Sequence, residues 1–281
     1  MQPPLERLTV TRWQAGVSSE ASDEVAEECP VALLYQGMPH VVMMATPADL
    51  EDLAVGFTIT EGIVDSVEEI RSVAVGPADV GSPAAATGIE GQLSRGLEAR
   101  VAIPSSRMAA LLARRRNLTA RGGCGLCGAE SVDHVLRHPG AAAPPGLQVE
   151  VGELHAALRA LRNHQPINAR VGSVHAAAWC RPGKGLELVR EDVGRHNALD
   201  KTLGALYRQG ISPASGYLIV TSRASYEMVQ KAAMAGVSLL AAVSAPTAFA
   251  IRLAQTWGLT LIGFARENQH VVYAHAQRLR A

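Results

Sequence analysis

Two cysteines in a glycine-rich segment are the residues best suited to chemistry. The segment RGGCGLCGAE contains Cys124 and Cys127, separated by two residues. A Cys-x-x-Cys pair can supply half of a zinc site or act as a pair of reactive thiols. The same letters match the dinucleotide template Gly-x-Gly-x-x-Gly through Gly123, Gly125 and Gly128, but that template follows a strand. An arginine-rich helical pattern precedes the cysteines instead, so the sequence argues against a dinucleotide loop.

The neighbouring residues separate the two remaining interpretations of the cysteine pair. His134 and His138 complete the spacing Cys-x2-Cys-x6-His-x3-His, whose middle gap is shorter than that of zinc fingers. Arginines at 114–116 and 121 would lower the pKa of a nearby thiol, and the glycines leave room for a partner to reach the sulfur. We therefore favour sulfur carriage, with Cys124 taking a persulfide and Cys127 assisting or resolving it. No metal ligand is assigned, and a local zinc site is the open alternative.

Composition excludes several classes of partner. The chain has 281 residues, 48% of them hydrophobic, and 26 basic residues balance 26 acidic ones. A net charge of zero gives no global attraction to nucleic acid or to an anionic membrane. The first residues lack the apolar run of a signal peptide, no stretch is apolar enough to span a membrane, and four cysteines make no disulfide framework. We expect a soluble cytoplasmic protein with neither nucleic acid nor membrane as partner.

The amino-terminal half reads as a small, strand-rich α+β subdomain. Two short strands flank a turn at Gly37, and a helix follows with Thr46 as its expected cap. A second helix, SSRMAALLARRRN, leads to the cysteines. The loop HPGAAAPPG resembles a domain boundary. The expected division is therefore an amino-terminal subdomain at 1–138, which carries the cysteine loop, and a second domain at 148–281.

The carboxyl-terminal half alternates strands and helices. A strand pair about the turn RPGKG comes first, and helices and buried strands then follow in turn to the last strands LTLIGFAR and HVVYAHA. This alternation predicts an α/β domain with a mostly parallel sheet and helices on both faces.

Polar residues recur where these strands end. Ligands of open α/β sheets bind at the carboxyl ends of the strands. The residues expected there are Asp192, Arg195, His196, Thr221, Ser222, Arg223, Ser244, Phe264 and Arg266. Arginines and helix starts along one edge of the sheet suit a phosphate-bearing ligand. The alternative, to which we give equal weight, is that the hydroxyl residues only cap helices and the arginines only face solvent. A polar cluster at a helix start favours a capping network over an Asp192–His196 acid–base pair, and His175 reads as a hydrogen-bonded core histidine.

The sequence resembles the FdhD family, the sulfurtransferases accessory to formate dehydrogenase. The resemblance extends over nearly the whole chain. It is carried by TPADLEDLAVGFTITEGIV, RGGCGLCGAES, VHAAAW, EDVGRHNALDK, ASYEMVQKAAMAGVSLLAAVSAPTAFAIRLA and LTLIGFAR.

This resemblance implies an activity and its partners. Such proteins take persulfide sulfur from a cysteine desulfurase onto the Cys-x-x-Cys loop. They bind the molybdenum cofactor as bis-molybdopterin guanine dinucleotide and sulfurate its metal before it enters formate dehydrogenase. A cytidine-deaminase-like larger domain and a homodimer are implied as well. The persulfide carries over to Cys124, with Cys127 as companion, and the guanine dinucleotide site carries over to the last strand end, at Phe264, Ala265, Arg266, Glu267, Asn268 and Gln269.

From the rim we add His196, Ser222 and Arg223 as cofactor-binding residues. Ser222 stands where the family has glycine, and Val171 and Ser173 depart from an expected Thr-Gly-Gly, which alters the ligand pose more than the function. The strand of His175 lacks the His-x-Glu of zinc deaminases, which disfavours deamination. The prediction is a sulfurtransferase that uses a cysteine persulfide. The alternative is a non-enzymatic cofactor chaperone with structural or zinc-bound cysteines.

Overall fold

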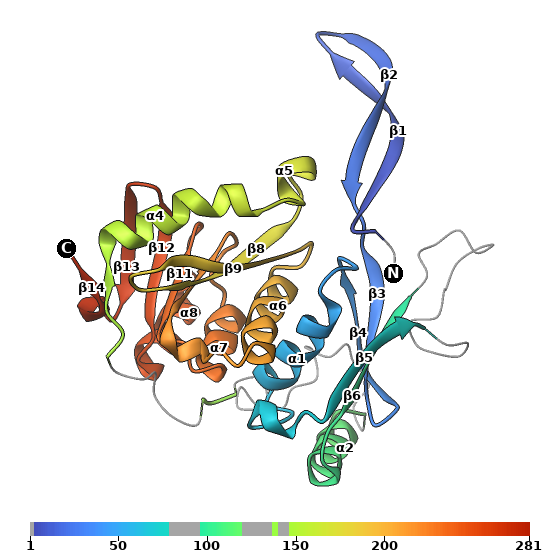
Figure 1. The fold of residues 1–281 in the computed structure, drawn as a ribbon, viewed down its shortest axis with the longest axis vertical. Helices are drawn as coiled ribbons and strands as arrows, with labels where there is room; N and C mark the ends of the chain where they lie inside the picture. The colour runs from blue at the N-terminus through green and yellow to red at the C-terminus, as the bar shows by residue number, and fades with distance from the viewer. Residues whose placement is uncertain (1–2, 79–95, 120–136, 140–145) are drawn as a thin grey trace.

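The computed structural model describes residues 3–78, 96–119, 137–139 and 146–281 (Figure 1). The cysteine loop with Cys124, Cys127 and His134 lies outside these residues. Among the described residues, no helix is long and apolar enough to cross a membrane. The expected division at 138 and 148 falls beside another undescribed segment and stays a prediction.

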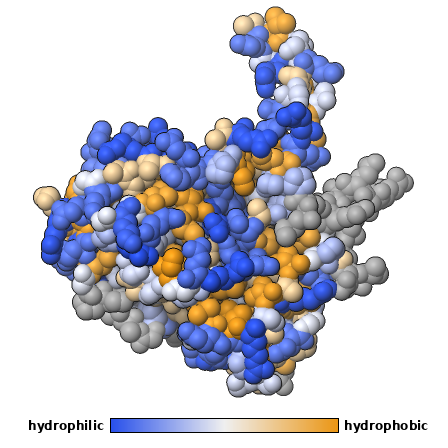
Figure 2. Space-filling model, in the orientation of Figure 1, coloured by the Kyte–Doolittle hydropathy of each residue, from blue (hydrophilic) through white to orange (hydrophobic). Residues whose placement is uncertain are grey.

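A two-stranded arm that sequence reasoning missed projects from the body of the molecule (Figure 1). Its strands are β1 (Leu5–Gln14) and β2 (Val17–Ala26), paired antiparallel throughout. Ala15 and Gly16 both have positive φ (50° and 82°), as in the primed turns that connect tight hairpins. Figure 2 shows a mainly hydrophilic arm with some apolar surface at its far end, where Trp13 and Val17 are each 70% exposed.

The amino-terminal sheet has the strand order β4-β3-β6-β5. The described elements of this half after the arm are β3 (Cys29–Tyr35), β4 (Met38–Ala45), α1 (Leu50–Thr60), η1 (Val67–Glu69), β5 (Ser72–Pro77), β6 (Leu97–Ala102) and α2 (Ser105–Thr119). The predicted strand pair about Gly37 and the helix before the cysteine loop are confirmed. The core between sheet and helices contains Leu33, Tyr35, Ile59 and Val101.

The predicted cap of α1 is wrong. The helix begins after Asp49, which has φ of 52°, and no side chain caps it. The Thr46 hydroxyl instead accepts a hydrogen bond from the Val193 amide (3.1 Å), and the Thr46 amide donates to Asp192 (3.1 Å). A contact with the other half of the chain therefore takes the groups that a local cap would have used.

The carboxyl-terminal sheet has six strands in the order β13-β12-β11-β10-β8-β9. They are β8 (His175–Arg181), β9 (Gly185–Asp192), β10 (Tyr217–Val220), β11 (Leu239–Ala242), β12 (Thr260–Arg266) and β13 (Gln269–Ala274). Only the β10–β11 and β11–β12 pairs are parallel. The expectation of a mostly parallel sheet is therefore wrong: the sheet is mixed. Short turns join β8 to β9 and β12 to β13, and a short turn can only return the chain antiparallel.

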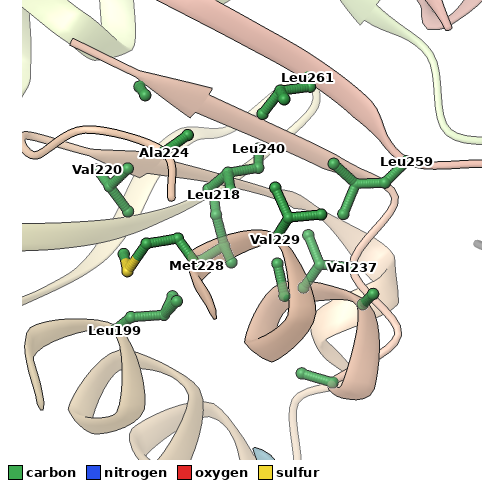
Figure 3. Close-up of a cluster of buried hydrophobic side chains, with 14 of the residues drawn as sticks. Leu199, Leu218, Val220, Ala224, Met228, Val229, Val237, Leu240, Leu259 and Leu261 are labelled. Atoms are coloured by element: carbon green, nitrogen blue, oxygen red, sulfur yellow. The ribbon is translucent and has the colours of Figure 1, made fainter. Parts of the chain in front are cut away.

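Helices cover both faces of this sheet, as predicted. One face carries α4 (Val151–Leu161), whose Leu154 and Leu158 pack on the sheet. The other carries α6 (Arg195–Arg208), α7 (Tyr226–Met234) and α8 (Ala248–Trp257). In Figure 3, Met228 and Val229 of α7 pack against Leu218 and Leu240 of the central strands. The cytidine-deaminase-like detail stays a prediction.

The shorter elements complete the second half. They are β7 (Val149–Glu150), η3 (Arg162–His164), α5 (Asn168–Val171), η4 (Pro213–Ser215), η5 (Ala276–Arg278) and β14 (Leu279–Arg280). Arg170 of α5 donates to Glu24 of the arm (2.7 Å), and the two arginines bonded to Glu24, Arg170 first and then Arg7, lower its pKa to about 2. This ion pair fixes one side of the arm to the body.

The two halves meet where α1 crosses α6 (Figure 1). A Cβ added to Gly56 would lie 1.8 Å from the Asp200 carbonyl oxygen, and one added to Gly204 would lie 1.9 Å from that of Asp52. Real Cβ atoms do not approach other atoms so closely, so both positions require glycine. The helices are therefore in backbone-to-backbone contact, which sets the distance between the halves.

Candidate functional site

The strand ends predicted to carry polar residues lie along one edge of the six-stranded sheet. β8 runs antiparallel to β10, so its first residue, His175, lies at the edge where β10 ends, opposite Asp192 of β9. The Thr221 amide donates to the Ala176 carbonyl there (3.0 Å), and the Phe264 amide donates to the Ser244 carbonyl (3.2 Å). We refer to this edge, from Asp192 to Phe264, as the rim.

Most polar residues of the motif EDVGRHNALDK hold the two halves together. The Lys201 ammonium lies 2.6 Å from the Asp192 carboxylate, and both side chains are completely buried. Lys201 also donates to the Thr46 carbonyl (3.0 Å), and Asn197 donates to Asp192 (3.0 Å) and to the Met44 carbonyl (2.9 Å). Asp192 is therefore committed to a structural network, in agreement with the interpretation favoured from sequence.

A second buried cluster surrounds Lys231 of α7. Its ammonium lies 2.8 Å from Asp200 and 2.9 Å from Glu61, and it donates to Thr60 (3.0 Å). Burial opposes the charge of Lys231, but the attraction of Asp200 and Glu61 outweighs burial and raises its pKa. Since Thr60 and Glu61 belong to the amino-terminal half, this cluster also ties the two halves together.

Two residues of the motif, Arg195 and His196, remain at the rim. His196 Nε2 lies 3.0 Å from the Glu227 carboxylate at the start of α7, and this close contact lowers the pKa of Glu227. His175 is half-buried beside them. Burial lowers its pKa, and the positive charges of Arg195 and His196 lower it further. The expected hydrogen-bonded core histidine is thus a member of a basic cluster on the rim.

The other predicted rim residues differ in their access. Ser222 is 4% exposed and its hydroxyl donates to the Arg223 carbonyl (3.0 Å), whereas the Arg223 side chain is exposed. Thr221 accepts from the Ala176 amide (2.9 Å) and so closes the end of the strand pair. Arg223 can therefore reach a ligand, while Ser222 has a local backbone role.

The predicted segment from Phe264 to Gln269 comprises the end of β12, the turn at Glu267 and Asn268, and the first residue of β13. Phe264 is 40% exposed and has φ of 49°, at an irregularity in the strand pairing. Ala265 is completely buried and can offer a ligand only its backbone. Arg266, Asn268 and Gln269 are exposed, and Glu267 is half-buried. An exposed aromatic ring beside an exposed arginine suits a nucleotide base and its phosphates.

Helix α4 holds this turn through contacts that sequence reasoning missed. His155 Nε2 lies 3.0 Å from Nδ1 of His270, and burial and the charge of His155 lower the pKa of His270. Arg159 donates to the Glu267 carbonyl (3.0 Å), and Arg162 lies 3.3 Å from the Glu267 carboxylate. The spacings of four and three residues place these side chains on one helical face. This spacing of His155, Arg159 and Arg162 is the sequence signal from which a shared polar face could have been predicted.

The chain returns from the undescribed cysteine loop at Arg137, which is fixed between the two halves. The Arg137 amide donates to Gln230 of α7 (2.9 Å), and its guanidinium pairs with Glu61. His138, a ligand in the zinc alternative, lies edge-on to Trp257 with ring centroids 6.1 Å apart. Whether Cys124, Cys127 and His134 lie near these residues is outside the described structure.

The other two cysteines, Cys29 and Cys180, are buried. Burial raises the pKa of Cys29 to about 11 and that of Cys180 to about 12. Neither thiol ionises near neutral pH, so neither is a nucleophile. Val171 and Ser173 depart from the resembled family: Val171 is the last residue of α5, and Ser173 lies in the connection from α5 to β8.

Fold and rim together define a two-part α/β protein with a basic cluster at the strand ends of its larger sheet. The chain belongs to the FdhD/NarQ family, whose model matches residues 26–280. It is 53% identical over 271 residues to a protein of Xanthomonas euvesicatoria named sulfur carrier protein FdhD, covering 96% of this chain and 91% of that one. A protein of the same name from Cupriavidus necator is 46% identical over 280 residues, covering 99% and 92%.

A solved structure shares the fold. The crystal structure of a putative formate dehydrogenase accessory protein from Desulfotalea psychrophila matches with a TM-score of 0.74 and 22% identity. The match covers 99% of this chain and 100% of the other. The arrangement of sheets and helices is therefore one that a solved protein also adopts. The arm is mostly outside the family model, which begins at residue 26.

Proposed function

We propose that this protein is a sulfur carrier that transfers persulfide sulfur to a molybdenum cofactor destined for formate dehydrogenase. The observation that carries this proposal is the 46–53% identity, over nearly their full lengths, to proteins named sulfur carrier protein FdhD. The Cys-x-x-Cys pair supplies chemistry that such a name requires, because a thiolate accepts and returns sulfur by exchange.

The first step loads sulfur onto Cys124. The Cys124 thiolate attacks the outer sulfur of a persulfide on a cysteine desulfurase. The sulfur–sulfur bond of the donor breaks, the donor cysteine leaves as a thiolate, and a persulfide forms on Cys124. The arginines that precede the cysteines in the sequence favour the attacking thiolate.

The second step releases the sulfur. The Cys127 thiolate attacks the inner sulfur of the Cys124 persulfide, so a Cys124–Cys127 disulfide forms and the outer sulfur leaves at the oxidation level of sulfide. That sulfide is the ligand that the molybdenum of the cargo accepts. A cellular dithiol reduces the disulfide before the next cycle.

The cargo is bis-molybdopterin guanine dinucleotide, held by the rim. Its phosphates meet His196 and Arg223, and the turn from Phe264 to Gln269 receives the guanine. Ser222 contributes through backbone. The geometry supports this placement because basic and aromatic side chains share one edge of the sheet. A homodimer in the cytoplasm, with desulfurase and formate dehydrogenase as its partners, completes the proposal.

Intact mass spectrometry tests sulfur carriage directly. The full chain is incubated with a cysteine desulfurase and cysteine, alongside Cys124→Ala, Cys127→Ala and the buried-thiol control Cys180→Ala. Gain of one sulfur atom by the native chain, Cys127→Ala and Cys180→Ala but not by Cys124→Ala supports the proposal. Absence of the gain from the native chain, with a zinc ion retained in stoichiometric amount, would leave only a cofactor chaperone with metal-bound cysteines.

A further inference from the structure

A groove of about 490 Å³ lies where the helices α1, α6 and α7 end. Because α6 and α7 begin next to the rim, at Arg195 and Tyr226, their last turns lie away from it. The groove is therefore separate from the rim. The larger apolar and aromatic residues that line it are Ile59, Val67, Tyr207, Ile211, Pro213 and Met234.

The groove is open to solvent. Several residues of its lining, including Ser66, Glu68 and Ser212, are exposed, whereas Ile59 is buried. A site for a small molecule typically encloses most of its ligand. An open groove with apolar side chains and a polar margin suits instead a side chain presented by a protein partner, as at the anchor positions of protein interfaces.

The lining carries negative charge that the chain itself does not neutralise. It contains two carboxylates, Asp65 and Glu68, and no basic residue in the described part of the chain. Arg107 pairs with Asp65 and also with Glu69 (2.6 Å), so one guanidinium serves two carboxylates. Glu68 has no ion pair among the described residues, and its side chain is exposed. The margin of the groove is therefore acidic.

The ends of the three helices add to this negative potential. The carboxyl-terminal end of a helix carries a partial negative charge, which a basic residue in the last turn can offset. Helix α1 has no basic residue there. In α6 and α7 the last-turn residues Arg208 and Lys231 are held by Asp52 (2.6 Å) and Asp200 (2.8 Å). A basic segment is therefore the electrostatic complement of the groove.

The groove adjoins the point at which the chain returns from the cysteine segment. Met234 of the lining and Arg137 both lie against Gly62: a Cβ at Gly62 would be 3.4 Å from the Met234 methyl carbon and 3.9 Å from Arg137 Cδ. Among the described residues, Arg137 is the first that follows the two cysteines in the sequence. A protein seated in the groove is thus beside the part of the chain that leads to them.

We propose that this groove docks the protein that donates sulfur to Cys124, through a segment that presents an apolar side chain flanked by lysine or arginine. The apolar side chain enters between the ends of α6 and α7, and the flanking cations lie against Glu68 and the helix ends. The inference rests on the proposed function in one respect, that the docked protein is the cysteine desulfurase. Docking here leaves the rim accessible while sulfur is loaded.

Loading kinetics on the full chain test the groove. Intact mass spectrometry measures the initial rate at which the chain, at several concentrations, gains sulfur from a catalytic amount of cysteine desulfurase supplied with cysteine. Glu68→Lys and Ser212→Trp should each raise the KM for the chain about tenfold and leave kcat unchanged, because they weaken docking and not sulfur exchange. The matched controls, Glu150→Lys before α4 and Ser19→Trp in the arm, alter exposed residues outside the groove and should behave as the native chain does.

Salt distinguishes the two groove variants from each other and from a general loss of fold. The KM difference between Glu68→Lys and the native chain should shrink as sodium chloride rises from about 0.05 to 0.5 M, because salt screens exposed charges. The effect of Ser212→Trp is steric and should persist. If Ser212→Trp melts early, the salt dependence of Glu68→Lys decides alone.

The remaining outcomes overturn the docking site or separate it from the proposed function. An unchanged KM in both groove variants, or equal increases in the controls, overturns it. Self-association that Ser212→Trp abolishes, measured by analytical ultracentrifugation, assigns the groove to a second copy of the chain and also overturns it. A native chain that gains no sulfur refutes the proposed function. In that case the groove stands only if calorimetry shows that the desulfurase binds and that Glu68→Lys weakens this binding.

Discussion

The contact between α1 and α6 makes a sharp prediction for Gly204→Ala. The new methyl carbon would lie 1.9 Å from the Asp52 carbonyl oxygen and 2.8 Å from the Gly56 amide nitrogen. Ordinary van der Waals contact needs about 3.5 Å, so the two helices must separate by roughly 1.5 Å. The backbone atoms involved lie within helices and cannot move alone, so the separation affects the whole crossing.

The energetic cost follows from the bonds that this separation stretches. The Thr60 hydroxyl donates to Asp200 across the crossing (2.7 Å), and Arg208 donates to Asp52 (2.6 Å). Overpacking costs about 1–3 kcal/mol, and loss of a partner for a buried polar group costs about 1–3 kcal/mol. Replacing glycine within a helix returns only about 0.5–1 kcal/mol. We therefore expect Gly204→Ala to lower the free energy of unfolding by about 3 kcal/mol.

Urea denaturation followed by circular dichroism measures this loss. The matched control is Gly152→Ala in α4, where an added Cβ meets no atom within 4 Å. That substitution should leave the free energy of unfolding unchanged or raise it by about 0.5 kcal/mol. A Gly204→Ala protein within about 1 kcal/mol of the native one, with an unchanged denaturant slope, would refute the backbone-to-backbone contact.

Three further predictions concern buried charge, pH and the rim. Lys231→Met should destabilise the protein by about 3–5 kcal/mol, because it leaves the buried Asp200 carboxyl without its cation, and the double variant with Asp200→Asn should recover part of that loss in urea denaturation. Burial and then the charge of His155 lower the pKa of His270 in the folded state, so the unfolded chain binds a proton at His270 more readily. The stability that neutral His270 contributes is therefore present above about pH 6.5 and is lost as the pH falls below that value. His270→Gln should therefore reduce the fall in unfolding free energy between about pH 7.5 and 5.5, and an unchanged fall would contradict this assignment. Phe264→Gly should change stability by less than about 1 kcal/mol, since relief of the left-handed backbone offsets the entropy cost of glycine, yet weaken binding of guanosine diphosphate measured by calorimetry.

Local patterns in the sequence predicted most of the elements. Glycines at 210, 236 and 258 follow the last turns of α6, α7 and α8 and have positive φ, so each is a local sequence signal for the end of a helix. The arm escaped prediction for the opposite reason. Most of its residues are exposed on both faces, so no alternation between apolar and polar residues marks its strands. Strand direction was also misjudged, because the pattern of buried residues does not record which way a strand runs.

The grouping of the candidate residues was predictable, but their individual contacts were not. The rule for strand ends predicted that these residues share one edge of the sheet, and they do. This rule could not show that Asp192 belongs to a structural network while Arg195 does not, because the partners of Asp192 include Thr46, which is 146 residues away. The contacts of α4 with the β12–β13 turn were missed for a similar reason: His155 and His270 are 115 residues apart. Long-range partners decide whether a polar residue supports the fold or faces a ligand.

The buried pair of Asp192 and Lys201 has a consequence for the order of folding. Both ions come from the carboxyl-terminal half, yet the backbone groups of Thr46 that complete their bonding come from the amino-terminal half. Removing either ion from water before Thr46 arrives would cost several kcal/mol. The second half alone should therefore keep this region hydrated and loosely packed. Docking of α1 then becomes the step at which water leaves, so the two halves should reach their final structure in a single concerted event.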